Sequence, residues 1–319
     1  MKRFALTAVL LGLALIGSAH AQVATTDLVP AAPFFTHPQA TGLNGANITP
    51  DNPAALAWGT PSRVAIGALK GKFEDNLTPP SPTVDFDGKF GGLRLVGETF
   101  GIAVEQLTVD EKNPPPGSPS NLDKSNDLQV SLALGKWLAF GIGAGKSKSE
   151  ATGDDISRKE AGISLRLNEI FYLGVAAYQD ENTPIGLVPS VSDKRNGTLY
   201  GIALRTEGNI KWYVAYDALA LNSFDFTPFG GPLSGGFDLS RFSVQAHAGW
   251  FLVGASVTDI DVKNYGGGKP TVKHKAVDLG FAPMQGLTVT ARVQVTDVSD
   301  PLPSDATITT NSLAVAWQF

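Results

Sequence analysis

The last nine residues of the chain, 311–319, alternate between two kinds of side chain. Leu313, Val315, Trp317 and Phe319 fall on one side of an extended chain, and small or polar residues fall on the other. Because strand side chains alternate between two faces, this segment predicts a strand with one apolar face. A soluble protein could end in such an edge strand. The same period-two pattern, however, recurs in about fourteen segments of the chain, which favours a larger β-structure.

The connections between these segments alternate between short and long. The predicted strands lie near 63–71, 90–98, 99–108, 127–135, 137–147, 159–168, 169–179, 197–206, 209–219, 238–248, 249–260, 271–281, 286–297 and 307–319. Tight turns at one end and longer loops at the other are typical of outer-membrane barrels. The sequence therefore predicts an all-β fold, a transmembrane antiparallel β-barrel of about 14 strands, with twelve to sixteen possible.

The first 21 residues have the pattern of a secretory signal peptide. A positive start at residues 1–3 precedes an apolar run over 4–16, and Ala19 and Ala21 form an A-x-A cleavage site. The apolar run is too short for a spanning helix. We expect cleavage after Ala21 and export from the cytoplasm.

Composition narrows the possible chemistry. The chain has no cysteine, 35 glycines, 17% charged residues and a net charge of -5 without a basic block. These values argue against a disulfide scaffold, a thiolate metal site and nucleic-acid binding. No catalytic motif is present, and we expect neither a cofactor nor a metal. A lipase site at His247 or His274 was considered, but both are predicted to face inward, away from membrane lipid.

Residues 22–62 lack strand or helix periodicity and are rich in proline. Phe34 and Phe35 make the segment too apolar for a free linker. Asn52 and Pro53 can cap a short helix through Ala54 to Trp58. The predicted domains are therefore a signal peptide (1–21), a plug segment (22–62) and a barrel (63–319).

Two motifs in this segment carry a family resemblance. ATGLNGA (40–46) and NPAALAW (52–58), just ahead of the first predicted strand, resemble the N-terminal hatch of the FadL-type hydrophobic-compound transporters. The resemblance implies a fourteen-stranded outer-membrane barrel whose N-terminal plug places an Asn-Pro-Ala motif, here Asn52, Pro53 and Ala54, in the lumen. It also implies inward passage of fatty acids or aromatic compounds.

Further candidate binding residues come from strand parity and from one unusual connection. Arg166, Arg205, Arg241 and Arg292 are predicted to face inward, where each could bind a substrate carboxylate or form salt bridges in a solvated lumen. The predicted external loop 220–237 is apolar. Its three phenylalanines, Phe224, Phe226 and Phe229, could collect substrate, or the loop could pack on its neighbours or on lipopolysaccharide.

These observations predict an outer-membrane channel of a Gram-negative-type bacterium for passive uptake of hydrophobic small molecules such as long-chain fatty acids or aromatic hydrocarbons. The alternative is a structural or non-specific porin-like barrel. The expected partners are outer-membrane lipid and lipopolysaccharide, a hydrophobic ligand, and the barrel-assembly machinery, which would read Trp317 and Phe319. We expect a monomer, no enzymatic activity and no nucleic-acid partner.

Overall fold

The computed structural model describes residues 52–58, 62–75, 83–112, 122–149, 154–167, 170–184, 193–206, 208–226, 233–263, 271–284, 287–299 and 306–318. Within these residues lie one short 3-10 helix, η1 (Pro53–Trp58), and fourteen strands. The strands are β1 (Arg63–Asp75), β2 (Thr83–Val96), β3 (Phe100–Glu111), β4 (Leu122–Leu134), β5 (Leu138–Ser149), β6 (Asp154–Leu167), β7 (Phe171–Pro184), β8 (Asp193–Arg205), β9 (Ile210–Phe226), β10 (Leu233–Ala248), β11 (Phe251–Lys263), β12 (Thr271–Met284), β13 (Leu287–Ser299) and β14 (Ala306–Gln318). The predicted signal peptide lies outside the described residues.

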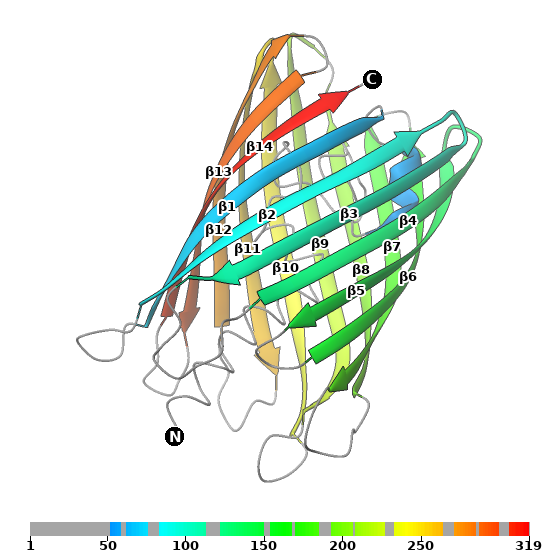
Figure 1. Cartoon of the computed structure of the whole chain (residues 1–319). Coiled ribbons are helices and arrows are strands. Elements are labelled where there is room, and N and C mark those ends of the chain that lie inside the picture. Colours follow the sequence, from blue (N-terminus) through cyan, green and yellow to red (C-terminus); the bar gives the residue numbers. More distant parts are fainter. Residues whose placement is uncertain are drawn as a thin grey trace.

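The strands form a closed barrel in which every strand pairs antiparallel with its neighbours in the chain (Figure 1). Closure comes from β1 and β14, which pair along their whole length, from Arg63 opposite Gln318 to Asp75 opposite Ala306. Every strand then has two partners, and no edge is left with unpaired backbone groups. The predicted barrel of about 14 strands is confirmed.

The strand ends at the short turns lie close to their predicted positions, and most ends at the long connections extend further than predicted. The prediction of an apolar external loop at 220–237 is wrong for most of its length. There β9 continues to Phe226 and β10 begins at Leu233, with these two residues paired. Antiparallel pairing is made by backbone hydrogen bonds, so a ladder can continue through residues whose side chains show no clean alternation.

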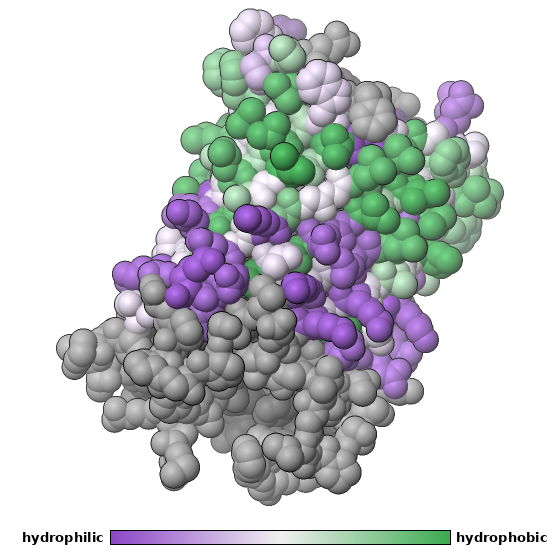
Figure 2. Space-filling view, viewed as in Figure 1, coloured by the Kyte–Doolittle hydropathy of each residue, from purple (hydrophilic) through white to green (hydrophobic). Residues whose placement is uncertain are grey.

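The outer wall carries a belt of exposed apolar side chains. Ile66, Ile142 and Leu279 are among the most exposed, at 65%, 65% and 61%. Figure 2 shows hydrophobic residues gathered over the part of the wall nearer the C-terminal end of β14, with hydrophilic residues beside them. Soluble proteins rarely expose such a continuous apolar surface. The belt therefore fits the hydrocarbon core of a membrane and makes this a transmembrane barrel.

Aromatic side chains mark the short-turn edge of this belt. Those exposed on the outer wall are Phe100, Trp137, Trp212, Trp250, Phe251, Phe281 and Trp317. Phe281 contacts both Trp250 and Phe251, with ring centroids 6.5 and 5.6 Å apart. Exposed aromatic residues near the short turns are typical of the interfacial girdle of an outer-membrane barrel.

Candidate functional site in the lumen

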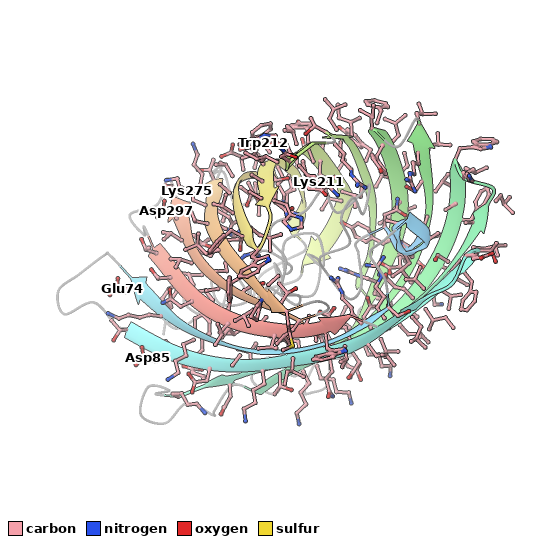
Figure 3. All side chains as sticks on the ribbon, turned by 90° about the horizontal axis from the view of Figure 1, so that it is seen from above. Glu74, Asp85, Lys211, Trp212, Lys275 and Asp297 are labelled. Atoms are coloured by element: carbon pink, nitrogen blue, oxygen red, sulfur yellow. The ribbon has the colours of Figure 1, made fainter. Side chains whose placement is uncertain are left out.

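Helix η1 lies inside the barrel and packs on the inner wall of β3 to β6 (Figure 3). Residues 52–56 are buried. The wall beneath them is built from small residues, above all Gly101, Gly141 and Gly162, which we call the helix seat. A Cβ at Gly141 would lie 2.2 Å from the helix backbone, and one at Gly162 would lie 1.9 Å from Asn52 Oδ1. The helix therefore approaches the wall too closely for any side chain at these positions.

Hydrogen bonds tie both ends of η1 to the barrel. At the start, Asn52 Nδ2 donates to the Ile163 carbonyl of β6 at 3.0 Å, and Asn52 Oδ1 accepts from the Ala54 amide at 3.1 Å. At the other end, Arg94 of β2 donates to the Leu56 carbonyl at 3.2 Å. A capping amide at the N-terminus and a cation at the C-terminus satisfy polar groups that a short helix leaves open.

A pair of buried arginines lies at the end of the helix. Arg63 and Arg94 face each other across β1 and β2, and both are fully buried. Leu56 packs beside them on small residues of the wall, namely Ala65, Ala103 and Ala316. Strand parity placed Arg94 inside, but Arg63 was missed because it is the first residue of β1 and no alternation precedes it. The sequence offered one signal for Arg63, its position directly after Ser62 at the start of the predicted strand 63–71.

Polar side chains run around the inner wall of β9 to β13 at one level of the barrel. Asp217, Arg241, Thr258, His274 and Thr296 are neighbours in the strand register, and all are buried. Arg241 Nε donates to Thr258 Oγ1 at 3.3 Å, and His274 Nδ1 lies 2.6 Å from Thr296 Oγ1. We call these five residues the polar row. Its members bond to one another, which fits the alternative of a salt-bridged and hydrogen-bonded lumen wall.

Next to the polar row lies an apolar inner patch on β14, β1 and β2. It consists of Leu69, Phe73, Val84, Phe90, Ala306, Ile308 and Ala314. The boundary between the two surfaces falls between Thr296 and Ile308, which are directly opposed on β13 and β14. Phe90 lies over Gly67, its cross-strand partner, so the ring lies along the wall of the lumen. The inner wall of these three strands therefore carries two apolar clusters, one of them at the long-connection end.

The four predicted arginines do not gather in one place. Arg166 and Arg205 lie near short turns, each over the ring of a tyrosine, Tyr172 at 5.9 Å and Tyr213 at 5.8 Å. Arg292 forms a buried bidentate pair with Asp278, with Nε 2.6 Å from Oδ1 and a second bond at 3.3 Å. Arg241 belongs to the polar row. Their predicted contact with a substrate carboxylate stays a prediction.

The aromatic candidates fall mostly outside the described side chains. Phe34, Phe35, Phe229 and Phe319 lie outside the described residues, and for Phe224 and Phe226 only their place in β9 is described. Trp317 is 48% exposed on the outer wall. The three residues of the Asn52-Pro53-Ala54 motif lie together in the lumen.

The described ranges contain neither a metal centre nor a membrane-spanning helix. No group of three or more His, Cys, Asp or Glu side chains there could hold a metal ion. Among those residues, too, no helix has the length and apolar character that crossing a membrane requires.

The fold and the lumen together define a transmembrane barrel that holds a helix of its own N-terminal segment. Among solved structures, the CymD monoaromatic hydrocarbon channel superposes with a TM-score of 0.55 at 10% identity, covering 91% of this chain and 95% of that one. The Ralstonia pickettii toluene transporter TbuX gives 0.55 at 8% identity, covering 91% and 97%. A Pseudomonas aeruginosa FadL homologue gives 0.53 at 11% identity, covering 84% and 93%.

At these identities the similarity shows a shared fold. The resemblance to the FadL-type barrels, stated above from the hatch motifs, is therefore confirmed at the level of the fold. No protein-family model and no curated protein sequence matches the chain.

Proposed function

We propose that the protein is an outer-membrane channel for passive, inward diffusion of hydrophobic small molecules, such as long-chain fatty acids or aromatic hydrocarbons. The observation that carries the proposal is the apolar inner patch. Phe73, Val84 and Ile308 are 3–5% exposed and face inward, although the inner wall of a water-filled barrel is ordinarily polar. Such a surface binds apolar compounds through the hydrophobic effect and needs no directional contact.

The seated helix supplies the second part of the proposal. The interior of a fourteen-stranded barrel exceeds what wall side chains alone fill, so it conducts water and ions unless other chain occupies it. Helix η1 packs mainly on β3 to β6, and its Leu56 reaches Ala65 of β1 and Ala316 of β14. The apolar inner patch extends from there toward the long-connection ends of β14, β1 and β2. We propose that residues 22–62 form the plug, that this arrangement restricts polar solutes, and that apolar compounds pass along the patch.

The location and partners follow from the same arrangement. We propose that residues 1–21 direct export and that the barrel, residues 63–319, resides as a monomer in the outer membrane of a Gram-negative-type bacterium. Its surroundings there are outer-membrane lipid and lipopolysaccharide, and Trp317 with Phe319 serves the assembly machinery. Phe34, Phe35 and the phenylalanines of the β9–β10 region, with the four inward arginines, remain our candidates for ligand contacts. The proposal assigns the chain no catalytic step.

The test changes the polarity of the patch with little loss of side-chain volume, since Val84→Thr is isosteric and Ile308→Thr is smaller by one heavy atom. The double variant V84T/I308T places two hydroxyls in the apolar inner patch. We expect it to lower uptake of radiolabelled oleate and toluene by cells several-fold, because each hydroxyl weakens binding of an apolar compound. Single-channel conductance of the purified protein in planar bilayers should stay at the parent value.

The matched control is V277T/V293T, which makes the same kind of change on the outer wall, where both residues are about half exposed. It should leave uptake unchanged once outer-membrane levels are matched. Equal uptake by V84T/I308T and the parent would contradict the proposal. So would uptake of hydrophilic sugars as fast as that of toluene, since this is the behaviour of a non-specific porin.

A further inference from the structure

Four lysines gather on the outer wall of β4 to β6, between the apolar belt and the long connections. They are Lys124, Lys146, Lys148 and Lys159, and we call them the lysine cluster. All four are exposed. Lys124 lies directly opposite Lys148 in the register of β4 and β5. Like charges at opposed positions of a sheet repel each other, so this arrangement favours an anion bound between them.

Lys146 lies within reach of the same anion, and Lys159 lies further along the sheet. Lys146 is opposite Asn126 on β4 and Ser157 on β6. Lys124 and Lys159 are two residues away from these partners, which makes them the diagonal neighbours of Lys146, with Cα atoms about 7–8 Å apart. A lysine ammonium sits on a long flexible stem, so the ammonium groups of Lys124, Lys146 and Lys148 can converge on one anionic group, while Lys159 adds positive charge nearby.

Among the described residues, carboxylates pair with few of these lysines. Among the described residues only Lys148 has an acidic partner, Asp155 at 3.4 Å. Lys124, Lys146 and Lys159 have no ion pair with any described residue. The described carboxylates therefore leave three of the four lysine charges unpaired.

The outer wall of β12 shows the opposite arrangement. There Lys273 lies 3.8 Å from Asp259. Lys275 lies 3.4 Å from Asp297, and both are labelled in Figure 3. Both lysines are exposed like those of the cluster, but each faces a carboxylate on a neighbouring strand. Basic residues thus occur at both places on the outer wall. Those of β12 are paired with carboxylates, whereas three of the four in the lysine cluster have no described ion pair.

A depression of about 610 Å³ adjoins the lysine cluster. The outward-facing residues that line it are Gly91, Val104, Gln106, Asn126, Leu128, Ala144 and Lys146. Lys146, Asn126 and Gln106 form its polar end, while Leu128, Val104 and Ala144 lie nearer the short turns and the apolar belt. A concave space of this size accepts a small ligand or part of an acyl chain. Its polarity gradient runs along the membrane normal, as it does in an amphipathic lipid.

We propose that this face binds a phosphorylated glycolipid of the outer leaflet, the lipid A part of lipopolysaccharide. The lysine cluster takes a phosphate group through charge-assisted hydrogen bonds, and the depression takes one acyl chain. In the barrel's orientation this places the phosphate at the long-connection end of the belt, where headgroups lie. The proposal rests on the outer-membrane location and is independent of which compound passes through the lumen.

The experiment titrates the purified full-length protein in nanodiscs with bisphosphorylated lipid A and with dephosphorylated lipid A of the same acyl chains. Native mass spectrometry counts the bound lipid. K124Q/K146Q should weaken binding of bisphosphorylated lipid A roughly tenfold or more, since two charge-assisted bonds are lost. The matched variant K273Q/K275Q should bind like the parent.

A second variant keeps every charge. Ala144→Trp fills the depression and should weaken both forms of lipid A, while toluene uptake by all three variants stays at the parent rate. The proposal is overturned if K124Q/K146Q binds like the parent, or if both lysine pairs lose binding equally. Dephosphorylated lipid A or phosphatidylglycerol binding as tightly as bisphosphorylated lipid A would also overturn it, in favour of a nonspecific lipid contact.

Discussion

The helix seat and the apolar inner patch belong to the same inner wall, but their composition is opposite. At Gly101, Gly141 and Gly162 the wall has no side chains, and the helix rests directly on backbone. On β14, β1 and β2 the wall carries large apolar side chains such as Phe73 and Phe90. The helix seat is thus defined by missing side chains, whereas the apolar inner patch is defined by large apolar side chains.

This difference separates two kinds of binding. The seat accepts one backbone shape and adds hydrogen bonds through Asn52 and Arg94, so it is specific for a segment of this chain. The patch offers area without directional groups, and apolar area binds in proportion to the surface removed from water, whatever the compound. A permanent internal ligand needs the first kind of surface, and a series of small transported compounds needs the second.

Removing the helix should have the largest effect and tests whether the helix seat needs its occupant to keep the lumen closed. Deleting residues 23–56 while keeping the signal should raise single-channel conductance to that of an open pore, because the seat is left unfilled and the lumen is wide. The measurement is conductance in planar bilayers, with heat-modifiable gel migration to show that the barrel still closes. Unchanged conductance would mean that the segment does not plug the lumen.

A methyl group in the seat should have the next largest effect. Gly141→Ala places a Cβ 2.2 Å from the helix backbone, so the helix must shift and conductance should rise in part. The matched control is Gly145→Ala on the same face of β5, where the new Cβ meets Asp127 Oδ1 at 3.2 Å and no atom of the helix. Bilayer recordings that show the same rise for both variants would assign the effect to the strand and not to the seat.

Loss of the Asn52 side chain should act more mildly. Asn52→Ala removes the bond to the Ile163 carbonyl and the cap on Ala54, each worth about 1 kcal/mol. We expect more frequent openings in single-channel recordings, with the melting temperature of the barrel almost unchanged. Asn311→Ala, an exposed position on the outer wall of β14, is the control. A lower melting temperature without new openings would assign Asn52 a role in barrel stability alone.

The smallest expected effect comes from moving the boundary of the patch. Thr296→Val extends the apolar inner patch by one strand and removes the hydroxyl contact of His274. Toluene uptake should rise by less than about twofold, since one buried methyl in place of a hydroxyl adds little area. Thr309→Val on β14, outside the lumen, should change nothing. A fall in uptake would show that the polar row, too, contributes to passage.

The sequence predicted the barrel well at one end and less well at the other. Ends at short turns are marked by aromatic residues and by turn glycines such as Gly135 and Gly249, which adopt positive φ. Ends at long connections carry no such mark. There β2 begins at Thr83 and not near residue 90, because the ladder continues beyond the apolar belt that gives rise to the alternation.

The lumen was predictable only in part for a related reason. Parity placed Arg94, Arg241 and Arg292 inside, and the Asn52-Pro53 pair predicted the start of the helix. Which strands the helix touches could not follow from parity, because Gly141 and Gly162 look like any other strand glycines in the sequence. The contact depends on glycines of β3, β5 and β6 that come together only when these strands pair in the sheet.

The pairing of β1 with β14 also bears on the order of events during biogenesis. Helix η1 immediately precedes β1, yet it rests on β3 to β6, while the ring closes only when the last strand joins the first. Pairing between residues so distant in the chain is slow to form. The helix therefore has a growing, still open sheet to settle on, and it is enclosed from the side when the seam closes instead of being threaded through a finished pore.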